Sequence, residues 1–341
     1  MLPLSRPATT AEIPIIDLHG LGFAGESDKR EVAQAVAEAC KEAGFFYIVN
    51  HGVEPAAIAD MFAAARTFFD LPLEKKEEVS LKSSGNRFRG YLPSFHKGDD
   101  PNLKENLQEA YQIHTELPPD DPDVLAGLPL HGPNPFPSAM PDLKPRMLAY
   151  QGKLAQLGQG LLRLMAIGLG LPETHFEPYF RKPMPMLRLL HYPPQKPDEE
   201  GVHLGARAHT DTNAFTILAQ DANGGLEIRN RDNEWVAVPP IAGTLVVNVG
   251  EVLKVWSDGI FSSTLHRVIN RSGRRRFSIP FFMYPSYDAL IQPLLRNPDP
   301  ANVAPENLHT SMPRDKPFVY GEFKSRHTAK IMPGQETKAT A

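Results

Sequence analysis

The sequence predicts a mainly β fold with flanking helices, in which an N-terminal α/β region precedes an antiparallel sandwich or barrel. The main observation is a series of seven short apolar runs between residues 186 and 284, separated by turn-forming residues. A second observation is that the clearest helical patterns come before this series. The seven runs are LRLLHY, FTILAQ, LEIRN, EWVAV, TLVVNV, STLHRVI and RFSIPFFMY.

The N-terminal region is expected to alternate strands and helices. Residues 13–17 predict a short strand, and residues 28–43 predict an amphipathic helix that ends at Gly44. The run FFYIV at 45–49 predicts a buried strand, and residues 54–69 predict a second helix. Cys40 lies in the Ala-rich pattern of the first helix and is expected to be a small buried residue.

The middle of the chain is expected to combine loops with one long helix. Residues 83–135 are rich in Gly, Pro, Asp and Asn, which favours long loops that frame a pocket. Leucines recur along one face of 143–169, so this segment predicts a helix that braces a sheet. Near the end, residues 317–332 predict a short helix, and residues 333–341 are expected to be disordered.

Composition limits the classes of function. The 341 residues are enough for one large globular unit, and the net charge of -4 comes from 36 basic and 40 acidic residues. Without an overall cationic field, the composition argues against nucleic acid as a partner. One cysteine, together with the lack of a signal-like or membrane-spanning run, predicts a soluble cytoplasmic protein with no membrane partner. The oligomeric state is left open.

His209 and Asp211 carry the most informative pattern in the chain. In a strand, residues two apart point to the same face, so the imidazole and the carboxylate can bind one cation. His266, in the run STLHRVI, would supply a third ligand from an antiparallel neighbour. Two histidines and one carboxylate leave coordination positions open, which suits non-haem Fe(II) and oxygen chemistry. Taken alone, the His-x-Asp pair fits a surface turn equally well, and other divalent ions accept the same ligands.

A candidate anion site follows on the last apolar run. Arg276 and Ser278 share one face of RFSIPFFMY, where the guanidinium and the hydroxyl would hold a carboxylate. Tyr192 ends the run LRLLHY, and its hydroxyl would complete the site, although a tyrosine before Pro-Pro is also a common packing residue. Arg274 and Arg275 are interpreted instead as a solvated basic run.

These motifs, in this order and spacing, resemble the iron- and 2-oxoglutarate-dependent dioxygenases of the isopenicillin N synthase-like family. The resemblance covers most of the chain and is weakest at 95–140 and after 290. Besides His209-x-Asp211, His266 and Arg276-x-Ser278, it rests on IPIIDL near the start, GFFYIVNHGV at 44–53, LHYPPQ at 190–195, GGLEI at 224–228 and LVVNVGEVLKVWSDGIFSSTLHRVIN at 245–270.

The resemblance implies a double-stranded β-helix, a distorted jelly roll, with an N-terminal α/β region packed against it. The expected single unit has an N-terminal dioxygenase region at 10–120, a bracing helix at 140–180, an Fe(II)/2-oxoglutarate jelly-roll core at 185–290 and a C-terminal segment with a disordered tail at 291–341. The implied activity is O2-dependent oxidation of a C–H bond in a small-molecule substrate, by hydroxylation or desaturation, with release of succinate and CO2. The resemblance implies that iron is bound by His209, Asp211 and His266, and the distal carboxylate of 2-oxoglutarate by Arg276, Ser278 and Tyr192.

Departures from the family pattern keep alternatives open. Plant members often have Asn-Tyr where this chain has Leu190-His191, so an amide that would touch the cosubstrate is absent. Arg-x-Ser also occurs in relatives that do not consume 2-oxoglutarate, including an oxidative cyclase. HGPNPFP at 131–137 and LRLLHYPPQ at 187–195 look like the bacterial ethylene- and succinate-forming enzyme, which has an aromatic residue where this chain has Thr212. A 2-oxoglutarate sensor without catalysis is an alternative of another class.

Substrate contacts are expected in the loops around the open metal positions. Arg89 and Tyr91 would bind a polar or anionic group, and Phe281 or Met283 would pack against a ring or chain. Ordinary packing explains these residues equally well. Arg188 is better placed because it shares a strand face with Tyr192, although it would also suit a core carboxylate. The full set of candidates is Arg89, Tyr91, Arg188, Thr212, Phe215, Phe281 and Met283.

Overall fold

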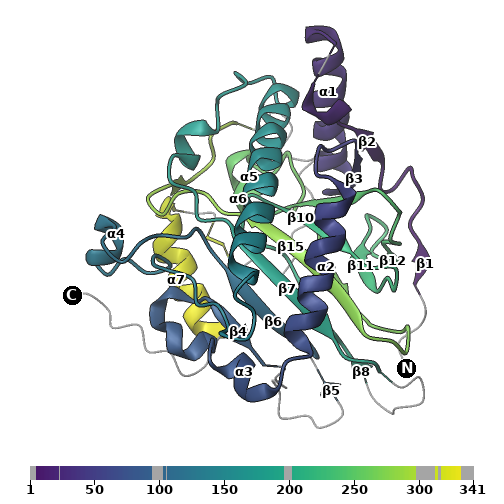
Figure 1. The fold of residues 1–341 in the computed structure, drawn as a ribbon. Helices are drawn as coiled ribbons and strands as arrows, with labels where there is room; N and C mark the ends of the chain where they lie inside the picture. Colours follow the sequence, from purple (N-terminus) through teal and green to yellow (C-terminus); the bar gives the residue numbers. More distant parts are fainter. Residues whose placement is uncertain are drawn as a thin grey trace.

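Two β-sheets face each other in the computed structural model, and the long helices cover the outer face of the larger sheet (Figure 1). The structure describes residues 5–22, 24–93, 103–104, 106–195, 202–296, 312–313 and 316–331. The eight-stranded sheet runs in the order β2 (Ile15–Asp17), β3 (Phe45–Val49), β13 (Leu245–Val249), β10 (Phe215–Gln220), β15 (Arg276–Met283), β7 (Met186–Tyr192), β6 (Glu109–Ile113) and β4 (Gly90–Leu92). The five-stranded sheet runs in the order β1 (Arg6–Pro7), β12 (Trp235–Ala237), β11 (Leu226–Arg229), β14 (His266–Val268) and β9 (Ala206–His209). This is the jelly roll that the family resemblance implied.

Two hydrophobic cores lie on opposite faces of the larger sheet. On β3, Phe46 and Ile48 belong to the core under the helices, whereas Phe45 and Tyr47 belong to the core between the sheets. Because both faces of this strand are covered, its sequence is apolar throughout rather than alternating. The buried strand predicted at 45–49 is therefore confirmed at the same residues.

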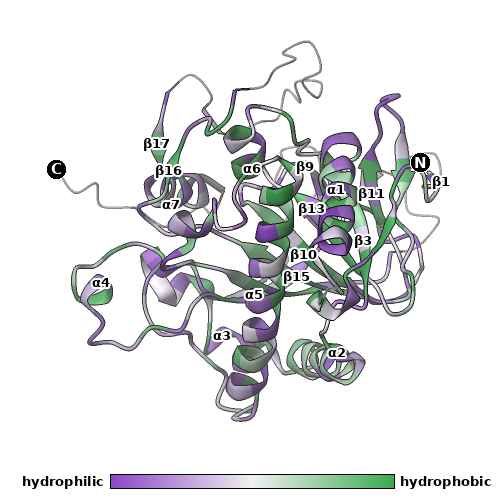
Figure 2. Ribbon diagram, turned by 90° about the horizontal axis from the view of Figure 1, so that it is seen from above, coloured by the Kyte–Doolittle hydropathy of each residue, from purple (hydrophilic) through white to green (hydrophobic). Residues whose placement is uncertain are grey.

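The helices of the outer layer are α1 (Glu26–Glu42), α2 (Pro55–Phe69) and α5 (Leu143–Gly168). Helix α5 packs against α1 and α2, and hydrophobic and hydrophilic residues alternate along α1 and α5 in Figure 2. Cys40 is buried on α1, as predicted. The three helices predicted in this part of the sequence are confirmed, with small differences at their ends.

Shorter elements complete the fold. The helices are α3 (Leu73–Glu77), α4 (Pro122–Leu125), α6 (Glu251–Trp256) and α7 (Tyr320–Ile331), and the strands are β5 (Leu103–Lys104), β8 (Val202–His203), β16 (Leu290–Ile291) and β17 (Phe318–Val319). Helix α7 confirms the helix predicted near the end, whereas residues 333–341, for which disorder is expected, lie outside the described ranges. No helix in the described part of the chain is long and apolar enough to cross a membrane.

Several short strands were not predicted as separate runs in the sequence, among them β6 and β9. Strand β6 lies in the segment predicted to form loops, and it pairs with both β4 and β7 in the larger sheet. Strand β9, which ends at His209, pairs with β14 in the smaller sheet. Both are short and contain polar residues, so their periodicity is too weak to predict a strand, and pairing with neighbouring strands in the sheets stabilises them.

Candidate metal and anion site

Three potential metal ligands meet between neighbouring strands of the smaller sheet. His209 ends β9 and pairs directly with His266, the first residue of β14, while Asp211 follows two residues after His209. The Nε2 atoms of His209 and His266 lie 3.8 and 3.9 Å from Oδ1 of Asp211. One ligand atom from each residue lies within 4.8 Å of the others, which fits a single shared cation. The structure thus brings together all three residues that the sequence singled out.

Each histidine is oriented by a hydrogen bond on the side of the ring away from the other ligands. Nδ1 of His209 lies 2.7 Å from the carbonyl oxygen of Arg207, and Nδ1 of His266 lies 3.1 Å from that of Thr264. A carbonyl oxygen only accepts, so Nδ1 carries the proton in the neutral ring and Nε2 keeps a lone pair for a metal. Protein atoms around the ring, and then His266, lower the pKa of His209 to about 4. The imidazole is therefore neutral at pH 7.

The Asp211 carboxylate is oriented by the larger sheet. Its Oδ2 accepts hydrogen bonds from Oγ1 of Thr216 on β10, at 2.6 Å, and from Nδ2 of Asn248 on β13, at 2.8 Å. These bonds leave Oδ1 turned toward the two histidines. Burial alone would raise the pKa of Asp211, but His266, His209 and the two hydrogen bonds lower it. The group is an anion at neutral pH.

The backbone around Asp211 is held by the start of α6. The amide of Glu251 donates to the carbonyl oxygen of Asp211 at 2.8 Å, and the amide of Val252 donates to that of Asn213 at 3.0 Å. A Cβ atom at Gly250 would lie 2.2 Å from the Asn213 carbonyl oxygen, so only glycine permits this approach. The glycine before α6 therefore helps to set the position of a metal ligand.

Arg276 and Ser278 form the candidate anion site on β15. Nη1 of Arg276 donates to Oγ of Ser278 at 3.2 Å, and its guanidinium lies 4.6 Å from the centre of the Tyr192 ring on β7. Arg276 and Tyr192 are directly paired across the two strands. The three residues predicted to form the anion site are thus adjacent, with Tyr192 in contact through its ring.

Arg276 is buried without a carboxylate partner among the described residues. Its Nε donates to the carbonyl oxygen of Gly224, and Nη2 lies 3.5 Å from Oε1 of Gln220. Arg276 is only 1% exposed, and every partner in these contacts is neutral. A buried cation with neutral neighbours is expected to bind an anionic ligand, because burial of an uncompensated charge is unfavourable.

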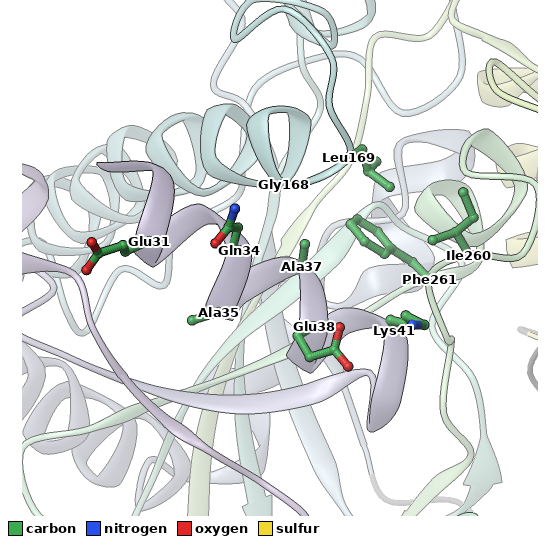
Figure 3. A pocket seen from close by; sticks show the side chains of 10 residues that line it. All are labelled: Glu31, Gln34, Ala35, Ala37, Glu38, Lys41, Gly168, Leu169, Ile260 and Phe261. Carbon is green, nitrogen blue, oxygen red and sulfur yellow. The ribbon is translucent and has the colours of Figure 1, made fainter. Parts of the chain in front are cut away.

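The triad and the anion site open into one cleft of about 660 Å³ between the two sheets. This volume is in the range of small-molecule sites. A second hollow, of about 610 Å³, lies on the outer surface beside α1 and the end of α5 (Figure 3). Its lining contains neither histidine nor arginine: Glu31, Gln34, Ala35, Ala37, Glu38, Lys41, Gly168, Leu169, Ile260 and Phe261. The cleft that contains the triad is therefore the candidate functional site.

The substrate candidates divide by their position. Arg188 and Thr212 line the cleft. Phe215, Phe281 and Met283 do not, because they point into the core under the helices. The expectation that these three contact a substrate is therefore corrected. The signal was available in the sequence, since residues 281 and 283 fall on the strand face opposite to Arg276 and Ser278.

Arg89 and Tyr91 also lie away from the cleft, which corrects the expectation that they bind substrate. Arg89 is fully buried and donates to the carbonyl oxygens of Leu130, at 2.6 Å, and Thr115, at 3.2 Å. Tyr91 donates to Glu109 at 2.7 Å. Both side chains stabilise the fold around the 115–134 segment and β6.

Two residues from the C-terminal helix line the cleft and were missed at the sequence level. Lys324 and His327 lie three residues apart on α7, which is yellow in Figure 1. Nζ of Lys324 donates to Oγ1 of Thr212 at 3.0 Å, and the Tyr320 hydroxyl donates to the Thr212 carbonyl oxygen at 3.0 Å. The helical spacing of residues 320, 324 and 327 defines one face, but nothing in the sequence places that face on the cleft.

Comparisons with known proteins agree with this site. The model of the 2OG-Fe(II) oxygenase superfamily matches residues 183–285, and that of the N-terminal region of the non-haem dioxygenases in morphine synthesis matches residues 13–139. A homoarginine-6-hydroxylase of Oryza sativa subsp. japonica is 34% identical over 83% of this chain and 88% of its own. The 2-oxoglutarate-dependent dioxygenase caaD of Aspergillus niger is 32% identical over 94% of this chain and 99% of its own. A full-length Neurospora crassa protein, whose crystal structure contains alpha-KG, is 28% identical, with a TM-score of 0.78 over 94% of this chain and 96% of that one.

Proposed function

Because the chain belongs to the 2OG-Fe(II) oxygenase superfamily, we propose that it oxidises a C–H bond of a small molecule, by hydroxylation or desaturation, with release of succinate and CO2. Fe(II), 2-oxoglutarate and O2 are the cofactor and cosubstrates of this class. A small-molecule substrate is supported by the Neurospora crassa protein, whose solved complexes include one with alpha-KG and thymine.

The observation that carries the proposal is that each triad residue is oriented by a hydrogen bond through an atom that does not face the shared centre. Backbone carbonyls accept from Nδ1 of His209 and His266, and Oδ2 of Asp211 is held by two side chains. Such outer contacts orient metal ligands and would be unnecessary in a surface turn. His209, Asp211 and His266 would hold Fe(II), which when bound supplies the redox chemistry that activates O2.

The residues of the larger sheet would orient the cosubstrate. Arg276 and Ser278 offer charge-assisted and neutral hydrogen bonds to the distal carboxylate of 2-oxoglutarate, and Tyr192 supports the guanidinium through its ring. Apolar side chains such as Leu204, Leu218 and Val268 line the same cleft and exclude water from it. The metal and anion sites therefore fix both ends of one small dicarboxylate.

The test is succinate release from 2-oxoglutarate across a panel of metabolites, with mass spectrometry of the products. We expect release that depends on Fe(II) and 2-oxoglutarate and is abolished in His209→Ala and Asp211→Ala. His19→Ala, which removes an exposed histidine near the N-terminus, is the matched control and should retain activity. Full activity in either triad variant, or after chelation of iron, would contradict the proposal.

The same assay separates the alternatives. Ethylene in the headspace would identify the ethylene- and succinate-forming reaction, and a product that has lost hydrogen with closure of a ring would identify a cyclase. Binding of 2-oxoglutarate in a calorimeter, without O2 uptake across the whole panel, would favour a sensor over an enzyme.

A further inference from the structure

The cleft carries more positive charge than the metal and cosubstrate sites account for. Four cationic side chains line it, from Arg188, Arg207, Arg276 and Lys324. Asp211 is the one carboxylate among its described lining residues. Arg276 and Asp211 belong to the sites proposed above, and Arg207 is exposed to solvent. Arg188 and Lys324 are left inside the cleft without an assigned role.

Arg188 on β7 is neutralised by no carboxylate within ion-pair distance among the described residues. Its Nε donates at 2.8 Å to Oε1 of Gln112, and Nη2 donates to the same oxygen. Gln112 is itself oriented, because its Nε2 donates to the carbonyl oxygen of Phe88 at 2.5 Å. A neutral amide therefore orients the guanidinium without compensating its charge, and Nη1 makes no hydrogen bond to the described residues. A core carboxylate, the other partner that the sequence allowed for Arg188, is not what it contacts.

Lys324 on α7 has a similar environment. Its ammonium donates to Oγ1 of Thr212 at 3.0 Å and lies 4.5 Å from the centre of the Tyr284 ring. In the described part of the chain it has no carboxylate partner at ion-pair distance. The hydrogen bond from Tyr320 to the carbonyl oxygen of Thr212 holds this end of the helix beside the metal site. The ammonium is thus positioned by neutral groups.

The two cations act on each other. Burial first, and then the positive charge of Arg188, lower the pKa of Lys324 to about 7, although the Asp211 carboxylate, which belongs to the metal site, acts in the opposite direction. Two like charges in a partly dry cleft are unfavourable unless an anion lies between or beside them. Apolar surface is adjacent, because the Phe282 ring lies 5.9 Å from the Arg188 guanidinium and Met186 lines the same wall. The cleft therefore offers a cationic pair next to an apolar wall.

We propose that Arg188 and Lys324 bind a carboxylate of the oxidised substrate, so that the substrate is an organic acid with an apolar body. This inference rests on the proposed function, since it names the substrate class of the same cleft. The carboxylate would accept charge-assisted hydrogen bonds from Nη1 of Arg188 and from Nζ of Lys324. The apolar body would lie against Phe282 and Met186, within reach of the metal centre.

The test uses the full chain with Fe(II) and 2-oxoglutarate under anaerobic conditions. Isothermal titration calorimetry measures the binding of a panel of aliphatic, aromatic and heteroaromatic acids, each paired with its primary amide, beginning with phenylacetate and phenylacetamide. The amide keeps the shape of the acid and removes its charge. We expect the acids that bind to have a Kd about tenfold or more below that of their amides, as charge-assisted hydrogen bonds predict.

Variants assign the preference to the two residues. Arg188→Gln and Lys324→Met should each weaken acid binding about tenfold and leave amide binding unchanged. Arg188→Lys, which keeps the charge, should retain part of the preference. Arg326→Gln is the matched control because it removes a positive charge from an exposed side chain of the same helix. It should bind acids as the unmodified protein does.

Three outcomes would overturn the inference. They are an acid panel that binds no better than its amides, variants that weaken acids and amides alike, and an Arg188→Gln variant that loses 2-oxoglutarate instead. The last would assign the arginine to the cosubstrate. Failure of the proposed function is a separate result, because acid binding without any Fe(II)-dependent oxidation would leave the carboxylate site intact.

Discussion

Asn248 on β13 donates a hydrogen bond from Nδ2 to Oδ2 of Asp211 at 2.8 Å, so a strand of the larger sheet orients a carboxylate that follows a strand of the smaller sheet. Substitution Asn248→Ala leaves this oxygen with Thr216 as its remaining side-chain donor. Because outer contacts of this kind tune metal affinity, we expect the Kd for Fe(II) to rise about tenfold. Anaerobic calorimetry would measure this change.

The control for this prediction is Asn86→Ala. Its amide donates to the carbonyl oxygen of Gly127 in an exposed turn away from the cleft. Iron affinity should be the same as in the unmodified protein. Equal iron affinity in Asn248→Ala and Asn86→Ala would show that the inter-sheet hydrogen bond does not support the metal site.

Loss of the Arg276 guanidinium is expected to weaken the binding of 2-oxoglutarate. In Arg276→Gln, the Kd for 2-oxoglutarate should rise about tenfold to a hundredfold, because a hydrogen-bonded charge pair is lost. Fe(II) affinity should stay close to its original value, since Arg276 is not part of the triad. The exposed Arg274→Gln variant, two residues earlier, is the control. A normal Kd for 2-oxoglutarate in Arg276→Gln would remove this residue from the cosubstrate site.

The backbone conformation of Gly225 is expected to position the Gly224 carbonyl oxygen that Arg276 contacts in the anion site. Its φ is +98°, and a Cβ atom there would lie 2.6 Å from the carbonyl oxygen of Ile269. The preceding residue, Gly224, accepts the hydrogen bond from Nε of Arg276. Gly225→Ala should therefore destabilise the protein by about 1 kcal/mol or more and weaken 2-oxoglutarate binding. Thermal unfolding and calorimetry measure the two effects.

Gly273→Ala is the control for Gly225→Ala, because it introduces backbone strain without displacing the turn at Gly225. Gly273 also has a positive φ, +65°, but a Cβ atom there meets nothing within 4 Å. This variant should lower stability and leave 2-oxoglutarate affinity unchanged. Similar losses of affinity in both variants would mean that the turn at Gly225 has no specific role.

Glu109 on β6 is expected to contribute to acid sensitivity. Burial by itself would raise its pKa, but hydrogen bonds from His191, Tyr91 and Lys76 bring the pKa down to about 2. The folded state thus binds the proton less tightly than the unfolded state, whose value is 4.5. The stabilisation is complete above pH 4.5 and disappears as the pH falls toward 2.

This contribution should amount to about 3 kcal/mol of the free energy of unfolding. Urea unfolding at several values between pH 5 and pH 2 would measure it, and Glu109→Gln should show a shallower loss of stability over this range. Glu26→Gln, on an exposed part of α1, is the control and should follow the unmodified protein. A slope in Glu109→Gln as steep as in the unmodified protein would contradict this prediction.

Strand alternation predicts much of the cleft, and on β15 it separates the residues that line the cleft from those in the core. On β15, Arg276 and Ser278 line the cleft as their spacing indicates, and the same spacing turns Phe281 and Met283 into the core. Phe282 and Tyr284, which were not candidates, share the cleft face with Arg276. The period-two pattern holds here because successive side chains of a strand point to opposite faces of the sheet.

Positions that depend on contacts between distant segments were not predictable in this way. Asn248 and Thr216 support Asp211 only because β13 and β10 cross beneath it, and Lys324 reaches Thr212 only because α7 packs over the cleft. Tyr91 and Arg89 lie in a polar, Gly-rich segment and looked available for a ligand. Their partners at Glu109 and Leu130 satisfy them within the fold.

The sequence by itself determined an antiparallel sandwich or barrel and the three potential ligands, because alternation along each strand and the order of motifs are local properties of the chain. The jelly roll was implied by the family resemblance. Only the tertiary structure decided which neutral groups orient Asp211. It also decided that Arg188 and Lys324 lie in one cleft and have no carboxylate partners among the described residues. The physical reason is that charge compensation depends on distance in space. Residues 188 and 324 are far apart along the chain, and only the packing of α7 against the sheets brings their charges together.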